Sequence, residues 1–302
     1  MDWKLTLAGL LIGVLVGMTG MGGGSLMTPM LVLLFGFKPT VAIGTDIVHG
    51  AIFKTFGAIR HRQLGTVNVP LTAWMLLGSA PMSLAGVGVA TWLEHRYGDG
   101  WEETAKQVLG AALLVCGIAF LVKALLRPRA ARPFTLTRTG KLQAVAVGLS
   151  GGFVVGLTSV GSGTFFGLML MLLFPLSAAQ IVGTDILHAA ALLGVAGVGH
   201  IVAGNVDFHA TGWLLLGSVP GVLIGSHYTV RVGDRPLRTA LSVVLFLSGV
   251  KLVDVPGANA IVIAGASVAA VFLAATAIRA FRRSVATAAT SLRDQAEEPA
   301  GS

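Results

Sequence analysis

The chain has 302 residues, of which 54% are hydrophobic and only 11% are charged. Soluble domains carry roughly 25% charged residues, so a chain with a mean hydropathy of +0.83 cannot cover itself with an ordinary polar surface. This composition excludes a soluble enzyme and indicates a protein whose solvent is largely lipid. The net charge of +8 is typical of a membrane protein with basic cytoplasmic loops. It does not indicate nucleic-acid binding, because no soluble basic domain is present.

Nine apolar segments follow one another along the chain. A bilayer crossing needs about 20 mainly apolar residues, and most of the segments have that length. Two of them are longer and are interrupted by glycine-rich breaks. We therefore expect an all-α, polytopic integral membrane protein. The predicted segments are 5–35 (broken), 41–59, 67–93, 104–126, 142–174 (broken), 178–202, 208–230, 237–253 and 258–280.

The two halves of the chain match each other without a gap. GTDIVHG at 44–50 aligns with GTDILHA at 183–189, which lies 139 residues later, and WMLLGSAP at 74–81 aligns with WLLLGSVP at 213–220 at the same offset. Chance does not plausibly produce two such matches in one register, so the fold is duplicated. Duplicated halves are a recurring plan of secondary transporters.

The loop charges predict that the two halves are inverted relative to each other. Lys and Arg concentrate in cytoplasmic loops, and the basic stretches here are 60–62, 127–141, 231–238 and 279–283. All four lie on one side if each long segment enters the membrane and returns as a re-entrant hairpin. If each long segment crossed once, the halves would be parallel and the last two stretches would lie outside. The inverted arrangement places the C-terminus in the cytoplasm.

These elements divide the chain into five parts. Each repeat has one broken, re-entrant or discontinuous helix and three spans, and one extra helix follows the second repeat. The predicted parts are the first membrane repeat (1–126), a basic cytoplasmic linker (127–141), the second membrane repeat (142–256), an extra transmembrane helix (257–283) and a disordered cytoplasmic tail (284–302).

The glycine-rich breaks are the first candidate site. Non-helical backbone at membrane depth is tolerated only where it is buried in protein or lines a wet cavity. Free N–H groups at the start of a half-helix favour an anion, and neighbouring hydroxyl groups add donors. The alternative interpretation is a close helix crossing that needs glycine only for packing. The predicted substrate-binding residues are Thr19, Gly22, Gly23, Gly24, Ser25, Thr158, Ser159, Gly161, Ser162, Gly163 and Thr164.

The repeated Asp-x-x-His pattern is the second candidate site. Ionisable residues in a span are costly and usually face the bundle interior, and a spacing of three places each Asp and His on one helix face. Such a pair can exchange a proton near neutral pH. The alternative is structural: Asp holds backbone N–H groups of the broken hairpin, and His bonds a carbonyl. The predicted coupling or structural residues are Thr45, Asp46, His49, Thr184, Asp185 and His188.

Three further polar residues lie in apolar segments. His61 and His200 match across the repeat near the ends of spans, so we expect them at the membrane interface. Lys54 has Leu193 as its counterpart. It can reach an anion or extend to the inner interface, and the second role is the expected one.

The residues of the first break also carry a family resemblance. The pattern Gly13-x-x-x-Gly17-Met-Thr-Gly-Met-Gly-Gly-Gly-Ser25, the following Pro29 and the Gly44-Thr-Asp46 helix resemble the sulfite exporter TauE/SafE family, also called the toluene sulfonate uptake permease family. The resemblance covers about residues 5–253, and the repeated motif strengthens it. It implies an inner-membrane transporter of sulfite, sulfonates or related organosulfur anions that is driven by an ion gradient, and it leaves the direction of transport open.

No other motif in the sequence carries chemistry. Seven His and one Cys form no ligand cluster beyond the two Asp-x-x-His pairs, so no metal or other cofactor is predicted. No nucleophile elbow, P-loop or Rossmann fingerprint occurs in a suitable context, so no enzyme is predicted. A passive anion channel, a membrane subunit that delivers sulfur species to a partner enzyme and, more weakly, a cation or metal carrier stay open. The predicted partners are a small-molecule anion and the lipid bilayer, without nucleic acid, and a homo-oligomer stays open.

Overall fold

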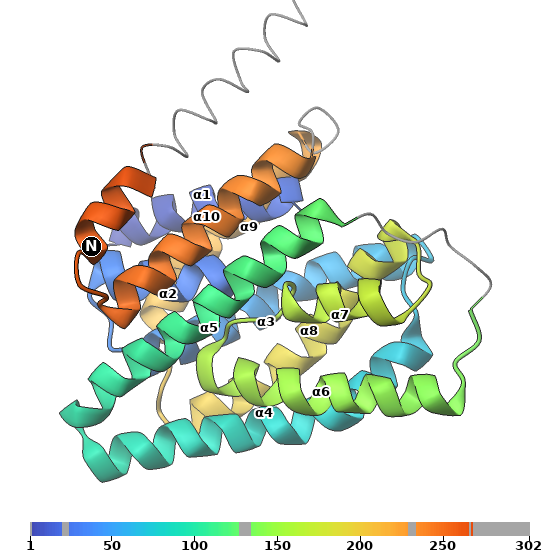
Figure 1. Ribbon diagram of the computed structural model, residues 1–302, viewed down its shortest axis with the longest axis horizontal. Coiled ribbons are helices and arrows are strands. Elements are labelled where there is room, and N and C mark those ends of the chain that lie inside the picture. The colour runs from blue at the N-terminus through green and yellow to red at the C-terminus, as the bar shows by residue number, and fades with distance from the viewer. Residues whose placement is uncertain (1, 20–23, 127–133, 229–233, 266, 268–302) are drawn as a thin grey trace, which may run out of the picture.

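The computed structural model describes residues 2–19, 24–126, 134–228, 234–265 and 267, and these residues form helices and connecting turns without any strand. The predicted all-α fold is therefore confirmed (Figure 1). The helices are α1 (Asp2–Thr19), α2 (Gly24–Phe35), α3 (Pro39–Gln63), α4 (Val69–Tyr97), α5 (Asp99–Leu125), α6 (Arg138–Thr158), α7 (Phe165–Leu173), α8 (Ala178–Val202), α9 (Phe208–Tyr228) and α10 (Asp234–Val253).

Several of these helices have the length and composition of membrane spans. Four are long and apolar enough to cross a bilayer, and shorter apolar helices lie at 3–16, 25–35, 208–224 and 241–253. A further helical stretch begins at 258 and is described to 265, so most of the extra C-terminal helix and the tail lie outside the described residues. The four long spans are Val69–Tyr97, Gly100–Lys123, Arg138–Thr158 and Ala178–Val202.

Short polar residues fix where the helices begin. Ser177 and Gln180 form a reciprocal capping box at the start of α8, which satisfies two N–H groups that a helix start leaves open. The side chains of Asn68 and Thr137 accept from backbone N–H groups at the starts of α4 and α6. The predicted segment 178–202 is confirmed, because α8 has the same bounds.

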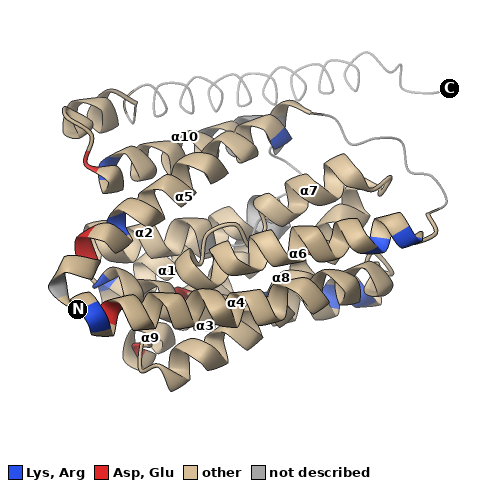
Figure 2. Ribbon diagram, turned by 60° about the horizontal axis from the view of Figure 1, so that its bottom comes forward, with Lys and Arg blue, Asp and Glu red and all other residues tan. Residues whose placement is uncertain are grey.

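Most of the charged residues gather at the two ends of the helical bundle (Figure 2). At one end, which we call the basic end, α3 finishes with Arg60 and Arg62, and α6 begins with Arg138. The Lys141 ammonium lies 5.1 Å from the centroid of the Trp74 ring on α4, which brings the start of α4 to the same end.

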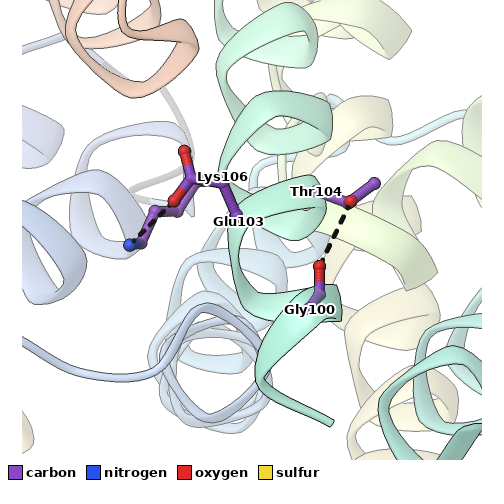
Figure 3. Close-up of polar contacts among 4 residues, drawn as sticks. All are labelled: Gly100, Glu103, Thr104 and Lys106. Atoms are coloured by element: carbon purple, nitrogen blue, oxygen red, sulfur yellow. Dashed lines mark hydrogen bonds and ion pairs between the residues drawn. The ribbon is translucent and has the colours of Figure 1, made fainter. Parts of the chain in front are cut away.

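The opposite end contains the start of α5. Here Lys38, which precedes α3, forms an ion pair of 2.6 Å with Glu102. Glu103 pairs with Lys106 at 3.3 Å, and the Thr104 hydroxyl donates to the Gly100 carbonyl at 3.4 Å (Figure 3). The first turns of α5 are therefore a polar cap on an otherwise apolar helix.

The chain between α6 and α8 returns to the end from which it started. Phe174, directly after α7, packs edge to face on Phe134, which lies four residues before the start of α6, with 5.7 Å between ring centroids. Figure 1 shows α6 and α7 running in opposite directions beside each other. The second glycine-rich break forms the bend between them.

Glycine rows allow two pairs of helices to pack with their backbones in contact. α1 packs on α9, and α4 packs on α6. A Cβ atom added to Gly13 would overlap the Ser218 carbonyl, and one added to Gly152 would overlap the Ser79 carbonyl. Small residues four apart allow this close approach between helices in lipid, which explains part of the high glycine content.

The centre of the bundle is formed by α3 and α8, which pack against each other. Every residue from 42 to 50 of α3 is buried. The two Gly-Thr-Asp motifs lie on these helices, so the topology places both aspartates inside the protein rather than against lipid.

Candidate functional site

The second glycine-rich break is a buried segment of non-helical chain. It runs from Ser159 to Thr164 between α6 and α7, and each of its residues is buried. Gly161 and Gly163 have φ values of 107° and 110°, and Ser159 has a φ of 62°. Glycine adopts such positive φ angles without the steric cost that a Cβ atom adds. The sequence GSG at 161–163 therefore permits the bend.

Two lysines from the first half of the chain bind this segment. Lys54 of α3 donates to the Ser162 hydroxyl at 2.9 Å and to the Ser162 carbonyl at 3.1 Å. Lys123 of α5 donates to the Gly163 carbonyl at 3.3 Å. Lys54 is only 4% exposed, so the expectation that it extends to the membrane interface is wrong. Its ammonium group turns inward because polar partners are available there.

Asp46 joins the two halves of the site. Its Oδ2 atom accepts from the hydroxyl of Thr28 on α2 and, at 2.8 Å, from the hydroxyl of Ser159. Its Oδ1 atom is buried without a hydrogen-bond partner in the described structure. Asp46 therefore contacts the first broken helix pair through Thr28 and the second through Ser159.

Asp185, its counterpart on α8, has different neighbours. The charges of Lys123 and Lys54 both act on it, and its Oδ1 atom is also buried without a described hydrogen-bond partner. The position that corresponds to Thr28 is Gly167. A Cβ atom there would lie 2.9 Å from Asp185 Oδ2 and would overlap Lys123 Nζ. The missing side chain leaves the room that the lysine occupies.

The predicted hydroxyl donors have different partners. The Thr158 hydroxyl donates to the Val154 carbonyl of its own helix and accepts from the Val160 amide, so it caps the end of α6. The hydroxyls of Ser25 and Thr164 are both buried without a hydrogen-bond partner in the described structure, and the Thr164 hydroxyl lies near the thiol of Cys116.

Part of the first break lies outside the described residues. Gly22 and Gly23 fall in the range 20–23, and the side chain of Thr19 is not described. Gly24 begins α2. Their predicted roles in substrate binding stay predictions.

The two histidines of the Asp-x-x-His motifs form a matching pair of contacts. His49 Nε2 lies 2.8 Å from the Ser218 hydroxyl on α9, and His188 Nε2 lies 2.8 Å from the Ser79 hydroxyl on α4. Neither ring is hydrogen-bonded to the Asp of its own motif among the described contacts. A direct Asp–His proton exchange has no support in this geometry, and the imidazoles instead connect one half of the chain to the other.

The threonines of the same motifs form a second matching pair. The Thr45 hydroxyl accepts from the Asp207 amide, and the Thr184 hydroxyl accepts from the Asn68 amide, each at 3.0 Å. Each threonine thus fixes the first turn of a helix from the other half. These contacts connect the two halves of the chain.

The two interfacial histidines predicted from the sequence differ from each other. His61 is partly exposed and bonds the Thr66 hydroxyl at 2.9 Å near the end of α3. His200 is fully buried, and its Nε2 atom donates to the Gly156 carbonyl at 3.1 Å. The interfacial expectation for His200 is wrong, because its ring is buried and binds a backbone carbonyl of α6 instead of reaching the membrane surface.

The site contains no metal centre in the part of the chain that the structure describes: no three His, Cys, Asp or Glu side chains gather there to hold an ion. Sequence reasoning missed Lys123, Thr28, Ser79 and Ser218. Ser79 and Ser218 were visible in the repeated Gly-Ser-x-Pro pattern, and Lys123 was visible as a charge near the end of an apolar segment.

An all-helical fold with four helices of membrane-spanning length and a buried polar centre defines a multi-pass membrane protein. The chain belongs to the sulfite exporter TauE/SafE family, whose family model matches residues 5–252. The predicted family is therefore confirmed.

Three curated relatives from Bacillus subtilis (strain 168) agree with this class. The chain is 39% identical to "Probable membrane transporter protein YjnA" over 257 residues, which cover 84% of this chain and 100% of the relative. It is 25% identical to "Probable membrane transporter protein YdhB" over 80% of this chain and 96% of the relative, and 24% identical to "Probable membrane transporter protein YunE" over 82% and 96%. No solved structure matches the chain.

Proposed function

We propose that this protein is a secondary transporter that moves a small sulfur-containing anion, such as sulfite or a sulfonate, across the cell inner membrane and is coupled to an ion gradient. The observation that carries the proposal is the binding of Lys54 and Lys123 to the buried segment between α6 and α7. Lysine inside a membrane protein is costly and marks substrate or ion pathways. The family name supplies the sulfur chemistry.

The lysine contacts are suited to a small oxyanion. An ammonium group has three donors, and the described hydrogen bonds of Lys54 use two of them, both to Ser162. Charge-assisted hydrogen bonds to an oxyanion are about twice as strong as neutral ones, so a few such donors are enough to bind a sulfur oxyanion away from water.

We further infer that the halves are inverted repeats, each with a re-entrant hairpin. Support comes from the reciprocal contacts His49–Ser218 and Ser79–His188, in which each residue of one pair corresponds to a residue of the other at the offset of 139. The return of the α6–α7 segment to the basic end fits a hairpin. By the positive-inside rule the basic end faces the cytoplasm.

Inverted repeats supply a way to alternate access. Rocking of one repeat against the other exposes a central site first to one side and then to the other. The centre of this molecule, where α3 and α8 meet, contains Asp46 and Asp185. The substrate would bind there, next to the second break.

Flux measurements on proteoliposomes test this function. Purified protein is reconstituted, and the uptake of radiolabelled sulfite is measured with and without an imposed pH gradient. Sulfate, thiosulfate and methanesulfonate are added as competitors. Gradient-dependent uptake that one sulfur anion inhibits is the expected result. Uptake that ignores every ion gradient identifies a passive channel instead, and no uptake of any of these anions contradicts the sulfur substrate.

A further inference from the structure

Several contacts between the two halves of the chain occur as matching pairs, but the last turns of α3 and α8 are an exception. The pairs His49–Ser218 and His188–Ser79 have the same length of 2.8 Å. His61 on α3 and His200 on α8 also correspond at the offset of 139, yet their partners differ. The two repeats therefore agree near the centre of the bundle and differ where these two helices end.

The end of α8 is fastened to both helices of the α4–α6 pair. The buried His200 donates from Nε2 to the Gly156 carbonyl of α6 at 3.1 Å. The side-chain amide of Asn205, just after α8, donates to the Thr91 hydroxyl of α4 at 3.2 Å. Because α8 begins at the basic end and runs away from it, these contacts lie toward the opposite end, which we call the far end.

Apolar packing completes the contact between α4 and α8. A Cβ atom at Gly199 would lie 3.1 Å from Leu84 Cδ2 and 3.4 Å from Val87 Cγ1, both on α4, so the small residue lets the two helices approach. Val87 is only 3% exposed. The seam between α4 and α8 is therefore closed to water near the far end.

A small hydrophobic cluster lies beside this seam. It consists of Ala90 on α4 with Trp101 and Ala105 on α5, and Leu157 at the end of α6 packs against it. Ala105 is 5% exposed, whereas Val244, its counterpart on α10, is 43% exposed. The equivalent position in the other repeat is thus left uncovered.

The end of α3, at the basic end, is not fastened in this way in the part of the chain that the structure describes. The described hydrogen-bond partner of the His61 ring is Thr66, only five residues further along, and the ring is partly exposed. Leu223 on α9, the counterpart of Leu84, is 68% exposed, compared with 45% for Leu84. The α1–α9 pair therefore does not hold the end of α3 as the α4–α6 pair holds the end of α8.

We propose that His200 and His61 are opposing latches of an alternating gate. In the present structure His200 keeps the far end closed by binding the Gly156 carbonyl. In a second state the repeats exchange conformations, the far end is released, and His61 closes the basic end by binding the carbonyl of Gly17 on α1, the counterpart of Gly156. The part that this gate has in transport rests on the proposed function.

The two latches act on one equilibrium in opposite directions. The His200 contact stabilises only the present state, and the His61 contact stabilises only the second state, so the loss of either shifts the populations. The loss of one ordinary hydrogen bond shifts such an equilibrium by roughly two- to tenfold. A permanent difference between the two ends would give His61 no such effect.

Cysteine labelling tests the gate without any substrate. The reporter is Val87→Cys in a Cys116→Ser background, in vesicles whose far end faces a membrane-impermeant maleimide, as labelling of Glu103→Cys verifies. His200→Ala should speed the reaction roughly two- to tenfold, His61→Ala should slow it by a similar factor, and the double variant should react like the parent. A His61→Ala rate equal to that of the parent overturns the second state. A parent rate as fast as that of Glu103→Cys overturns the closed far end.

Two controls separate gating from a loss of stability. Leu214 is fully buried on α9, which packs on α1, and this packing is the same in both states, so Leu214→Cys should stay unreactive in every variant. His200→Gln keeps a side-chain N–H donor and should restore slow labelling at position 87. Reaction of Leu214→Cys in the His200→Ala background, or labelling in His200→Gln as fast as in His200→Ala, overturns the latch role of His200.

Cross-linking tests whether transport needs the gate. Thr91→Cys and Asn205→Cys are combined in the Cys116→Ser background and joined with a short bifunctional methanethiosulfonate. Sulfite uptake should stop and return after reduction, whereas each single-cysteine variant should keep its uptake under the same reagent. Undiminished uptake with the seam cross-linked, or no cross-link at all, overturns the gate. No sulfite uptake before cross-linking, with the labelling pattern intact, refutes the proposed substrate and supports the gate.

Discussion

The Nζ atom of Lys54 lies 2.9 Å from the hydroxyl of Ser162, and this contact connects α3 of the first half to the broken segment of the second. Both residues are buried. The contact brings a positive charge to the bend between α6 and α7, in which Ser159, Gly161 and Gly163 have positive φ values.

Replacing Lys54 by Met should lower sulfite uptake strongly. A hydrogen bond to a charged group contributes about 1.5–3 kcal/mol, which corresponds to a loss in substrate affinity of roughly ten- to a hundredfold. Lys54→Arg, which keeps the charge, should retain part of the uptake.

The matched control is Lys106→Met. Lys106 forms a surface pair with Glu103, and such pairs contribute at most about 1 kcal/mol, so uptake should not change. Equal uptake by Lys54→Met and Lys106→Met would show that Lys54 has no part in binding.

Alanine at position 163 should abolish transport while the protein still inserts into the membrane. Gly163 has a φ of 110°, and a non-glycine residue in such a conformation costs about 1–3 kcal/mol. The bend would relax, and the Gly163 carbonyl that Lys123 binds would move.

Gly88→Ala is the control for that substitution. Gly88 lies on an exposed face of α4, and a Cβ atom there meets no other atom within 4 Å. Uptake and membrane insertion should both stay normal. If Gly163→Ala transported like Gly88→Ala, the conformation of the break would not matter for function.

The two imidazole–hydroxyl contacts should contribute equally to stability. Ser79→Ala and Ser218→Ala each leave a buried His nitrogen without its partner, and an unsatisfied buried group costs about 1–3 kcal/mol. Thermal unfolding in detergent should show a similar decrease in Tm for each variant, and the double variant should show the sum.

Ser150→Ala serves as the reference for these variants, because Ser150 is exposed and bonds only carbonyls of its own helix. Its Tm should match that of the wild type. A wild-type Tm in both Ser79→Ala and Ser218→Ala would refute the link between the halves.

Cysteine labelling tests which end of the bundle faces the cytoplasm. The only cysteine, Cys116, is buried, so a Cys116→Ser background is suitable. Arg62→Cys at the basic end should react with a membrane-impermeant maleimide only in inside-out vesicles, and Glu103→Cys should react only in right-side-out vesicles. Labelling of both from the same side would contradict the proposed orientation.

The sequence was sufficient to predict α8 and the second glycine-rich break, because both depend on local properties. Apolar length and capping residues define α8, whose bounds agree with the predicted 178–202. Glycines that need positive φ define the bend near Gly161. These features depend on residues within a few positions of each other.

The interactions inside the site were not predictable in the same way. The orientation of Lys54 depends on a serine 108 residues later in the chain, and a pattern of apolar residues does not specify such a partner. His200 is buried for the same reason, since its partner is a carbonyl of α6. The difference between Thr28 and Gly167, by contrast, can be read from the offset of 139 residues once the contacts of Asp46 are known.

The most direct test of the transporter account is the accumulation of sulfite against its own concentration gradient. Proteoliposomes are loaded with radiolabelled sulfite at the external concentration, and a pH gradient is then imposed. The account predicts that the internal concentration rises above the external one with wild-type protein, and that it does not rise with Lys54→Met. Equal concentrations on both sides with the wild-type protein, at a flux well above that of empty liposomes, would contradict coupled transport and identify a passive pathway.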